Sequence, residues 1–260
     1  MKTATKIGAA VALFVLLCAG PARAEATSDA GLWLQSMAKA QTEGPLRFRY
    51  AMESAIGGQP GSVKMEGHVT QNGPKRIRAE MTMTMVMGDS KVETKSLQVV
   101  DGEKIWIEMR NPMMGGTQVM RMSIDQAGKM AGGGMPMGAG SDPLQQIEQM
   151  SKMFDLKVTE ETQQTVTLRA EATKDTLAEM EKAGAAPEAL QSLGSYVLVV
   201  DKATGFPREA RFGGDPPAMV VRFSDFERLA EVDPATFRYT PPEGVTVIDM
   251  EAMASDEPEK

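Results

Sequence analysis

The stretch that decides the fold is RIRAEMTMTMVM, residues 76–87. Apolar residues fall on every second position, with Arg, Glu and Thr between them, and they include Ile77, Met81, Met83 and Met85. Side chains of a β-strand point alternately to its two faces. The stretch therefore predicts a strand with one apolar and one polar face, as in an antiparallel sheet that packs on one side only.

The same alternation recurs along most of the chain. It is clear at 46–53 and 63–70, and further strands are predicted at 104–109, 118–124, 155–161, 164–171, 195–201, 206–212 and 218–226. Turn signals such as Asn72-Gly73-Pro74 separate these strands. Many short antiparallel strands predict an α+β, mostly β fold, with a large curved sheet or half-open barrel.

Three segments predict helices that would cover the concave face of the sheet. The first begins at a cap, either Ser28 or Asp29, and the second follows the cap Ser141-Asp142-Pro143. The third segment, 173–193, is interrupted by Gly184 and Pro187 and is expected to form two short helices. The apolar side of the first helix consists of Leu32, Leu34, Met37 and Ala38. That of the second consists of Leu144, Ile147, Met150, Met153 and Phe154, of which the first three are expected to form a lid.

Residues 1–24 have the pattern of a secretory signal peptide. Two lysines precede an apolar run of about eleven residues, too short to span a bilayer, and Ala22-Arg23-Ala24 supplies a cleavage site. We expect cleavage near Ala24 and export to the periplasm. Cys18 allows a second interpretation as a lipid-modified cysteine, although bulky Leu17 precedes it where a small residue is needed.

The chain beyond the signal peptide is expected to form one domain over 25–250. Within it, the Gly- and Met-rich residues 128–140 predict a flexible insert, because the segment is long for a loop. Residues 251–260 are expected to be a disordered acidic tail.

Composition excludes several classes of protein. The 260 residues include one Cys, one His and 22 Met. Cleavage lowers Lys plus Arg from 28 to 25 against 35 acidic residues, a net charge of about −10, which argues against nucleic-acid binding. With no Cys left and one His, a zinc or His-rich metal site is not expected. No GxSxG or HExxH motif occurs, so we expect no enzyme activity and no cofactor.

Four motifs occur in a set order along the chain. They are PKRIRAE at 74–80, DGEKIW at 101–106, DKATGFPR at 201–208 and DPATFRYTPPEGV at 233–245. In this order, after a signal peptide, they resemble segments of the periplasmic outer-membrane lipoprotein carriers, the LolA-like family, over roughly residues 28–250. The sequence departs from this family at Gly73, where the carriers have an Arg that helps to hold the lid closed.

The resemblance implies a half-open β-barrel closed by helices around an apolar cavity for the acyl chains of lipoproteins. A divergent member would bind lipoproteins or lipids, receive them from an inner-membrane donor complex and pass them to an outer-membrane acceptor. We expect it to act as a monomer. The same fold resemblance extends to sensor domains that regulate envelope-stress anti-sigma factors, so a regulatory domain is an alternative.

The methionines have three interpretations, which the sequence leaves open. Of the 22, 14 lie between residues 81 and 153. They can form an ordinary core face, or a lining that adapts to acyl chains because Met is unbranched and flexible. Thioethers also bind Cu(I), and a copper-binding protein would use the methionines in Gly-containing sequence, which are Met113, Met114, Met130, Met135 and Met137.

The predicted cavity wall combines the apolar faces of the first strands with Trp106 and the later methionines. It consists of Leu46, Phe48, Tyr50, Met52, Met65, Val69, Ile77, Met81, Met83, Met85, Trp106, Met109, Met120 and Met122.

Overall fold

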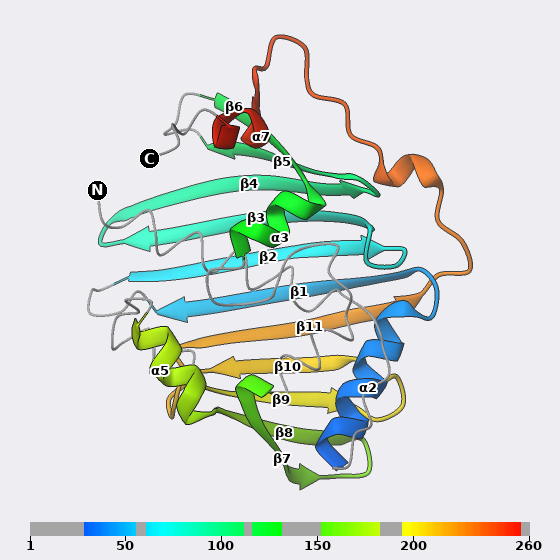
Figure 1. The fold of residues 1–260 in the computed structure, drawn as a ribbon, viewed down its shortest axis with the longest axis vertical. Helices are drawn as coiled ribbons and strands as arrows, with labels where there is room; N and C mark the ends of the chain where they lie inside the picture. Colours follow the sequence, from blue (N-terminus) through cyan, green and yellow to red (C-terminus); the bar gives the residue numbers. More distant parts are fainter. Residues whose placement is uncertain (1–28, 56–60, 112–115, 132–151, 183–193, 256–260) are drawn as a thin grey trace.

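The computed structural model describes residues 29–55, 61–111, 116–131, 152–182 and 194–255 (Figure 1). Its elements, in chain order, are α2 (Asp29–Thr42), β1 (Leu46–Ala55), β2 (Gly61–Gln71), β3 (Arg76–Met87), β4 (Ser90–Asp101), β5 (Lys104–Asn111), β6 (Gly116–Ser123), α3 (Ile124–Ala131), β7 (Phe154–Glu161), β8 (Thr165–Ala172), α5 (Lys174–Lys182), β9 (Ser195–Asp201), β10 (Pro207–Phe212), β11 (Met219–Arg228), the 3-10 helix η3 (Pro234–Phe237), β12 (Val247–Asp249) and α7 (Met250–Ser255).

All twelve strands belong to one sheet, in the order β12-β6-β5-β4-β3-β2-β1-β11-β10-β9-β8-β7. Two antiparallel meanders, β1–β6 and β7–β11, are joined where β1 pairs with β11, and β12 adds a short parallel strand beside β6. In the described part of the chain, the edge strands β7 and β12 do not pair with each other, so the sheet stays open. The predicted class, a large antiparallel sheet with a few helices, is confirmed.

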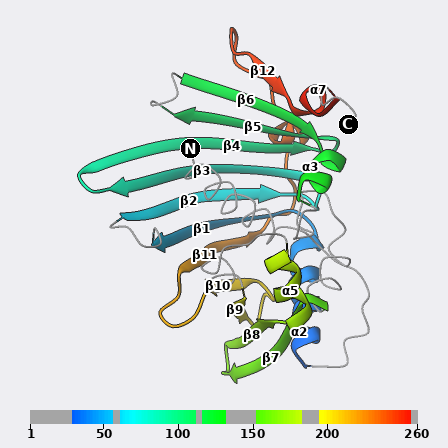
Figure 2. The same ribbon diagram turned by 60° about the vertical axis from the view of Figure 1, so that its left-hand side comes forward.

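The helices α2, α3 and α5 lie on one face of the sheet, as Figures 1 and 2 show from two directions. We call this the inner face; it carries Leu46, Phe48 and Tyr50 of β1. The opposite face, which carries Arg47 and Arg49, is the outer face. Residues that pair in register across strands share a face, so the pairing assigns every strand position to one face or the other.

Most of the predicted strands are present, with two omissions. β4 and β12 were not predicted, and residue 124, expected at the end of a strand, starts helix α3. Helix α3 also takes in residues 128–131 of the expected flexible insert, and residues 132–140 lie outside the described part of the chain. Helix α7 takes in residues 251–255, which were expected to be disordered.

Helix α2 forms as predicted and seals one end of the inner face. Asp29 lies in its first turn, and Leu34, Met37 and Ala38 are buried one turn apart. Leu32, which was predicted on the same side, is 57% exposed, so that assignment is wrong. Arg228 of β11 donates to the backbone oxygens of Ala40 and Glu43 and so satisfies carbonyls at the end of the helix.

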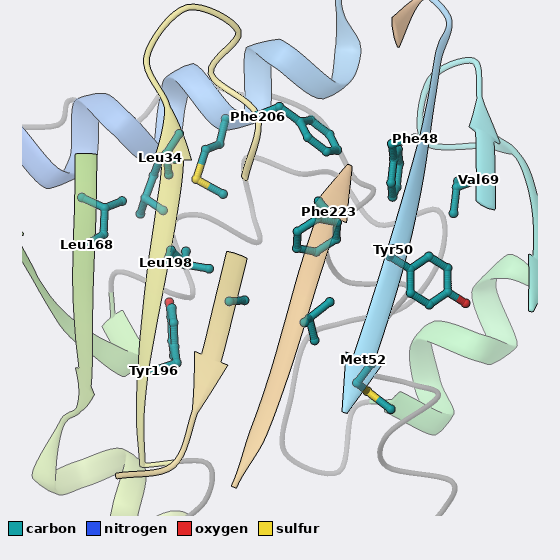
Figure 3. Packing of buried hydrophobic residues seen from close by; sticks show 14 of the residues in the cluster. Leu34, Phe48, Tyr50, Met52, Val69, Leu168, Tyr196, Leu198, Phe206 and Phe223 are labelled. Carbon is teal, nitrogen blue, oxygen red and sulfur yellow. The ribbon is translucent and has the colours of Figure 1, made fainter. Parts of the chain in front are cut away.

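The core below α2 is aromatic. Phe48, Phe206 and Phe223 pack edge to face or tilted, with ring centroids 5.0–6.0 Å apart, and Figure 3 shows the three rings facing one another. Such ring pairs bury a large apolar area and fix their relative geometry. This part of the inner face is an ordinary protein core.

Two of the sequence motifs are turns closed by aspartates. Asp101 accepts hydrogen bonds from the backbone nitrogens of Glu103 and Lys104 and from the Trp106 indole. Asp201 accepts from the backbone of Ala203 and Thr204 and pairs with Arg208. Each carboxylate accepts hydrogen bonds from backbone N–H groups that have no backbone partner in a tight turn. The motifs therefore specify hairpins.

The motif at 233–245 belongs to a C-terminal strap, residues 229–249, that crosses the outer face. Asp233 caps η3 by accepting from the backbone nitrogen of Ala235 at 2.8 Å, and Phe237 is buried against the sheet. The strap then reaches β12, where Asp249 pairs with Arg121 of β6. Its course from β11 to α7 can be followed in Figure 1.

One close backbone approach limits the residue type in β2. A Cβ built on Gly67 would lie 2.2 Å from the backbone oxygen of Glu80 on β3, so Gly67→Ala has to push the two strands apart. We expect it to lower the free energy of unfolding by about 1–3 kcal/mol, measured by urea denaturation.

The control for this substitution is Gly214→Ala. A Cβ at Gly214 meets no atom within 4 Å, so the change should be less than about 0.5 kcal/mol. Equal stability of Gly67→Ala and the unsubstituted protein would contradict the close approach.

Candidate functional site

The inner face of β3–β6 is defined by rows of residues in register. One row runs from Ile77 through Val100 and Ile105 to Met122, and a second runs from Ala79 through Gln98 and Ile107 to Met120. Further rows place Met81 and Met109 on the same side, with Met83 and Met85 beyond them along β3. The methionines of three strands thus come together on one face.

The structure places thirteen of the fourteen predicted cavity residues on the inner face. Eight of them are buried: Leu46, Phe48, Tyr50, Met52, Met65, Val69, Ile77 and Met81. Five are half-buried: Met83, Met85, Met109, Met120 and Met122. Their role in binding a ligand stays a prediction.

Trp106 is the exception, and its predicted position is wrong. It pairs with Val99 and Arg121, which lie on the outer face. There its ring lies 5.4 Å from that of Tyr239 in the strap, with the Arg121 guanidinium 5.5 Å from its centroid. Because Ile105 and Ile107 flank it, three apolar residues follow one another, and the alternation pattern cannot decide which face of the sheet Trp106 occupies.

Several predicted residues cannot be placed. The predicted lid residues Leu144, Ile147 and Met150 lie outside the described part of the chain. So do Met113, Met114, Met135 and Met137 of the copper hypothesis. Among the residues that the structure describes, the inner face is approached by α2, α3 and α5 (Figure 2).

The inner face has two halves of different character. Over β1 and β8–β11 its side chains form the sealed core, where Leu168, Val200 and Ala210 have no exposed surface. Over β3–β6 the outermost methionines and Ile107 are only half-buried. The side chains of Ile124 and Ala127 from α3 pack against this second half. One half therefore holds the fold together, and the other keeps apolar surface accessible.

Sequence reasoning missed the inner-face residues of β4 because it missed the strand. Thr94 and Gln98 are 8% and 7% exposed and belong to the small set of buried polar residues. Apolar alternation does not mark this strand, because the inner-face residues in its middle, Thr94, Ser96 and Gln98, are polar. The only signal available was its place between two turn signals, Gly88-Asp89 and Asp101-Gly102, at the length of a strand.

A groove of about 760 Å³ lies on the outer face. Its wall includes the charged and titratable side chains of Arg49, Glu66, His68, Arg78, Glu80, Lys95, Glu108, Arg110 and Arg222. Many of these pair with one another or with a neighbour: Glu80 contacts Arg78 at 2.8 Å and His68 at 3.4 Å. Exposed pairs of this kind contribute little to stability. The groove is a solvated surface whose wall carries five basic and three acidic side chains besides His68.

Glu108 holds the strap against this surface. Its carboxylate, 4% exposed as a residue, accepts from the Tyr239 hydroxyl and from Arg110 Nε, each at 2.6 Å. Burial raises the pKa of Glu108, but the two hydrogen bonds and the charge of Arg110 outweigh it, so the pKa lies below 4.5. Burial and the same carboxylate raise the pKa of Tyr239.

Among the described residues, no group of three or more His, Cys, Asp or Glu side chains is arranged to hold a metal ion. No helix among these residues has the length and apolar character to cross a membrane.

No protein-family model matches the chain, and no curated protein matches it in sequence. Among solved structures it is similar to an uncharacterized conserved protein from Thermus thermophilus, with 12% identity over 85% of this chain and 99% of that one, and a TM-score of 0.45. It is also similar to the MucA/MucB complex of Pseudomonas aeruginosa, with 13% identity, 82% and 62% coverage and a TM-score of 0.41.

A third similar structure is a LolA superfamily protein from Nitrosomonas europaea. The identity is 10%, the coverage 82% of this chain and 99% of that one, and the TM-score 0.31. None of these similarities assigns a function to this chain, which has to be inferred from its own residues.

The contact between Tyr239 and Glu108 gives a test of the strap. Tyr239→Phe removes one hydrogen bond from a buried carboxylate, and we expect it to lower the free energy of unfolding at neutral pH by about 1–3 kcal/mol. Since the folded-state pKa of Glu108 is lowered, the stability that this group contributes is complete above pH 4.5 and is lost as the pH falls through the folded-state pKa. The difference between the two proteins should therefore shrink below that pH.

Tyr196→Phe is the matched control. The hydroxyl of Tyr196 is buried and has no hydrogen-bond partner in the described residues, so its removal should not destabilise the protein. Denaturant unfolding followed over a range of acidic pH values measures both effects. A loss of stability in Tyr196→Phe as large as in Tyr239→Phe would contradict the role given to Glu108.

Proposed function

We propose that this protein binds acyl chains on the inner face of β3–β6 and carries lipoproteins or lipids across the periplasm toward the outer membrane. The observation that carries the proposal is the set of half-buried methionines on a mostly apolar face. Met83 and Met85 on β3 and Met109 on β5 keep accessible surface although the face around them is core. Accessible apolar surface of this kind usually marks a binding site.

The chemistry of methionine suits this task. Its side chain is unbranched and polarizable, and it adjusts to ligands of different shape. Burial of an acyl chain contributes about 0.8 kcal/mol for each methylene, so ten buried methylenes supply roughly 8 kcal/mol. Such a face therefore binds lipid without any catalytic group, and no chemical step is part of the proposal.

Carriage also requires release. A face that is only half covered lets an acyl chain leave toward a membrane acceptor, whereas a sealed core would retain it. The proposed partners are an inner-membrane donor complex and an outer-membrane acceptor, and the signal-like residues 1–24 support export. The resemblance of the four motifs to lipoprotein carriers supports the same assignment.

Native mass spectrometry tests the proposal on protein purified from the periplasm without detergent. We expect adducts with the masses of diacyl lipids or of lipidated peptides. Protein that carries no adduct, and that binds neither N-phenyl-1-naphthylamine nor a fluorescent fatty acid, would show that the face is an ordinary core.

Two neighbouring residues of β3 allow a more local test. Met85 points to the inner face and Val86 to the outer face, and both are half-buried. Met85→Asp places a carboxylate where an acyl chain would lie, and we expect at least about a tenfold loss of affinity for the fluorescent fatty acid, because a charge in an apolar site is costly.

Val86→Asp is the control, with the same chemical change on the other side of the same strand. It should leave the affinity within about twofold of the unsubstituted protein. Thermal unfolding of both variants shows whether each is folded. Equal losses of affinity in two folded variants would remove the inner face as the binding surface.

A further inference from the structure

The inner face of β4 differs from that of its neighbours. Between Val92 and Val100 its inner positions are Thr94, Ser96 and Gln98. These pair across β3 with Met83, Met81 and Ala79. On the other side, Ser96 pairs with Met109 and Gln98 with Ile107 of β5. A row of three polar residues thus runs along an apolar face, between two apolar strands.

The three polar residues are short of partners. Thr94 and Gln98 are more than nine-tenths buried. Within the described part of the chain, no hydrogen bond joins the side chains of Thr94, Ser96 or Gln98 to another residue. Among the described residues, the polar atoms of these three side chains do not belong to the fully buried atoms that lack a partner, so they still reach the surface of the inner face. A molecule bound on this face can therefore exchange hydrogen bonds with them.

Side-chain size points the same way. Thr94 and Ser96 are shorter than the methionines Met83 and Met81 with which they pair on β3. The row is therefore lower than β3 at these two positions, whereas Gln98 extends above Ala79 beside it. We call residues Thr94, Ser96 and Gln98 the polar furrow.

The lack of charged side chains on the described inner face of β3–β6 limits the class of ligand that can bind there. The inner positions of β3 hold Ile, Ala and Met, and those of β5 and β6 hold Ile, Met, Asn, Gln and Gly. No position on the inner face of β3–β6 carries a charged side chain in the described residues. A carboxylate or phosphate placed there would have no counter-ion, whereas an ester or amide needs only hydrogen bonds.

We propose that the polar furrow binds the uncharged ester or amide linkage of an acylated ligand, with the acyl chains on the flanking methionines, and that it selects such ligands over free fatty acids. The inference rests on the proposed acyl-chain binding and adds the position and the polarity of the bound group. The hydroxyls of Thr94 and Ser96 and the amide of Gln98 donate to carbonyl oxygens, and Gln98 also accepts from an amide N–H.

Competition for bound N-phenyl-1-naphthylamine, an uncharged apolar probe, tests this. The competitors are methyl laurate, N-methyl lauramide and laurate, which share one chain length and differ in the linkage. For the full-length processed protein at neutral pH we expect the ester and the amide to compete at least about tenfold more strongly than laurate, since the carboxylate of laurate would be desolvated on this face without a counter-ion.

Substitutions separate the furrow from the apolar face. Gln98→Leu and Thr94→Val should reduce the preference for the ester and the amide at least about fivefold, and leave the affinity for the apolar probe unchanged or higher. Thr82→Val is the control for Thr94→Val, because it is the same substitution on the outer face of β3. It should leave all affinities unchanged.

Stability provides a second readout. Because these side chains have no partner in the described residues, Gln98→Leu and Thr94→Val should keep or raise the melting temperature. A marked drop in either variant would show that the polar groups have a structural role, and would overturn the inference.

The two proposals fail in different ways. If the probe and every competitor fail to bind, the proposed acyl-chain binding is wrong, and so is the proposed role of the polar furrow. If they bind but laurate competes as well as methyl laurate, or Gln98→Leu keeps the full preference, the face binds acyl chains and the furrow does not select the linkage.

Discussion

The structure depends on how an open sheet covers its apolar face. A closed barrel would seal its own interior, but here β7 and β12 are separate edges of a twelve-stranded sheet. Apolar side chains on the inner face must then be covered by other parts of the chain or by a ligand. Helix α2 does this at one end, where Leu34 and Met37 pack on the aromatic core. The half over β3–β6 is covered less completely, and its half-buried residues include flexible methionines.

This division separates stability from binding. The sealed half contains large, well-defined side chains such as Phe48 and Leu168, which pack to the density of a protein interior. On the outer face the strap adds a second small core, in which η3 with the buried Phe237 lies against β3 and β4, and Tyr239 lies against Trp106 of β5. These parts fix the sheet in place. The methionine-lined half can then accommodate ligands of different shapes without loss of the fold.

The sequence predicts the architecture well wherever one strand face is apolar. Period two in β1–β3 and the spacing in α2 identify elements that the structure confirms. The prediction fails for two physical reasons. Trp106 lies between two isoleucines, so periodicity could not choose its face, and only the strap, which is distant in sequence, decides it. Helix α3 could not be separated from the strand before it, since its burial depends on the sheet it packs against.

β4 was missed for a different reason, and this omission coincides with the proposed ligand contact. A strand that carries Thr94, Ser96 and Gln98 on its buried side lacks the pattern by which buried strands are recognised. Local sequence and global fold disagree most often at functional sites. The motifs that supported the family resemblance, by contrast, mark turns and the strap, where Asp101, Asp201 and Asp233 bind backbone nitrogens. These motifs therefore indicate the fold, whereas the proposed ligand contacts lie on the inner face of β3–β6.

The most direct measurement is photo-crosslinking with an acyl ester that carries a diazirine near the middle of its chain, followed by peptide mass spectrometry. The probe reacts with whatever side chain lies against the acyl chain, so it reports the location of binding. We expect adducts on inner-face residues of β3–β6, such as Met83, Met109 and Met120. Adducts on outer-face residues such as Thr82 and Leu97, or labelling that excess unlabelled ester does not reduce, would contradict the account.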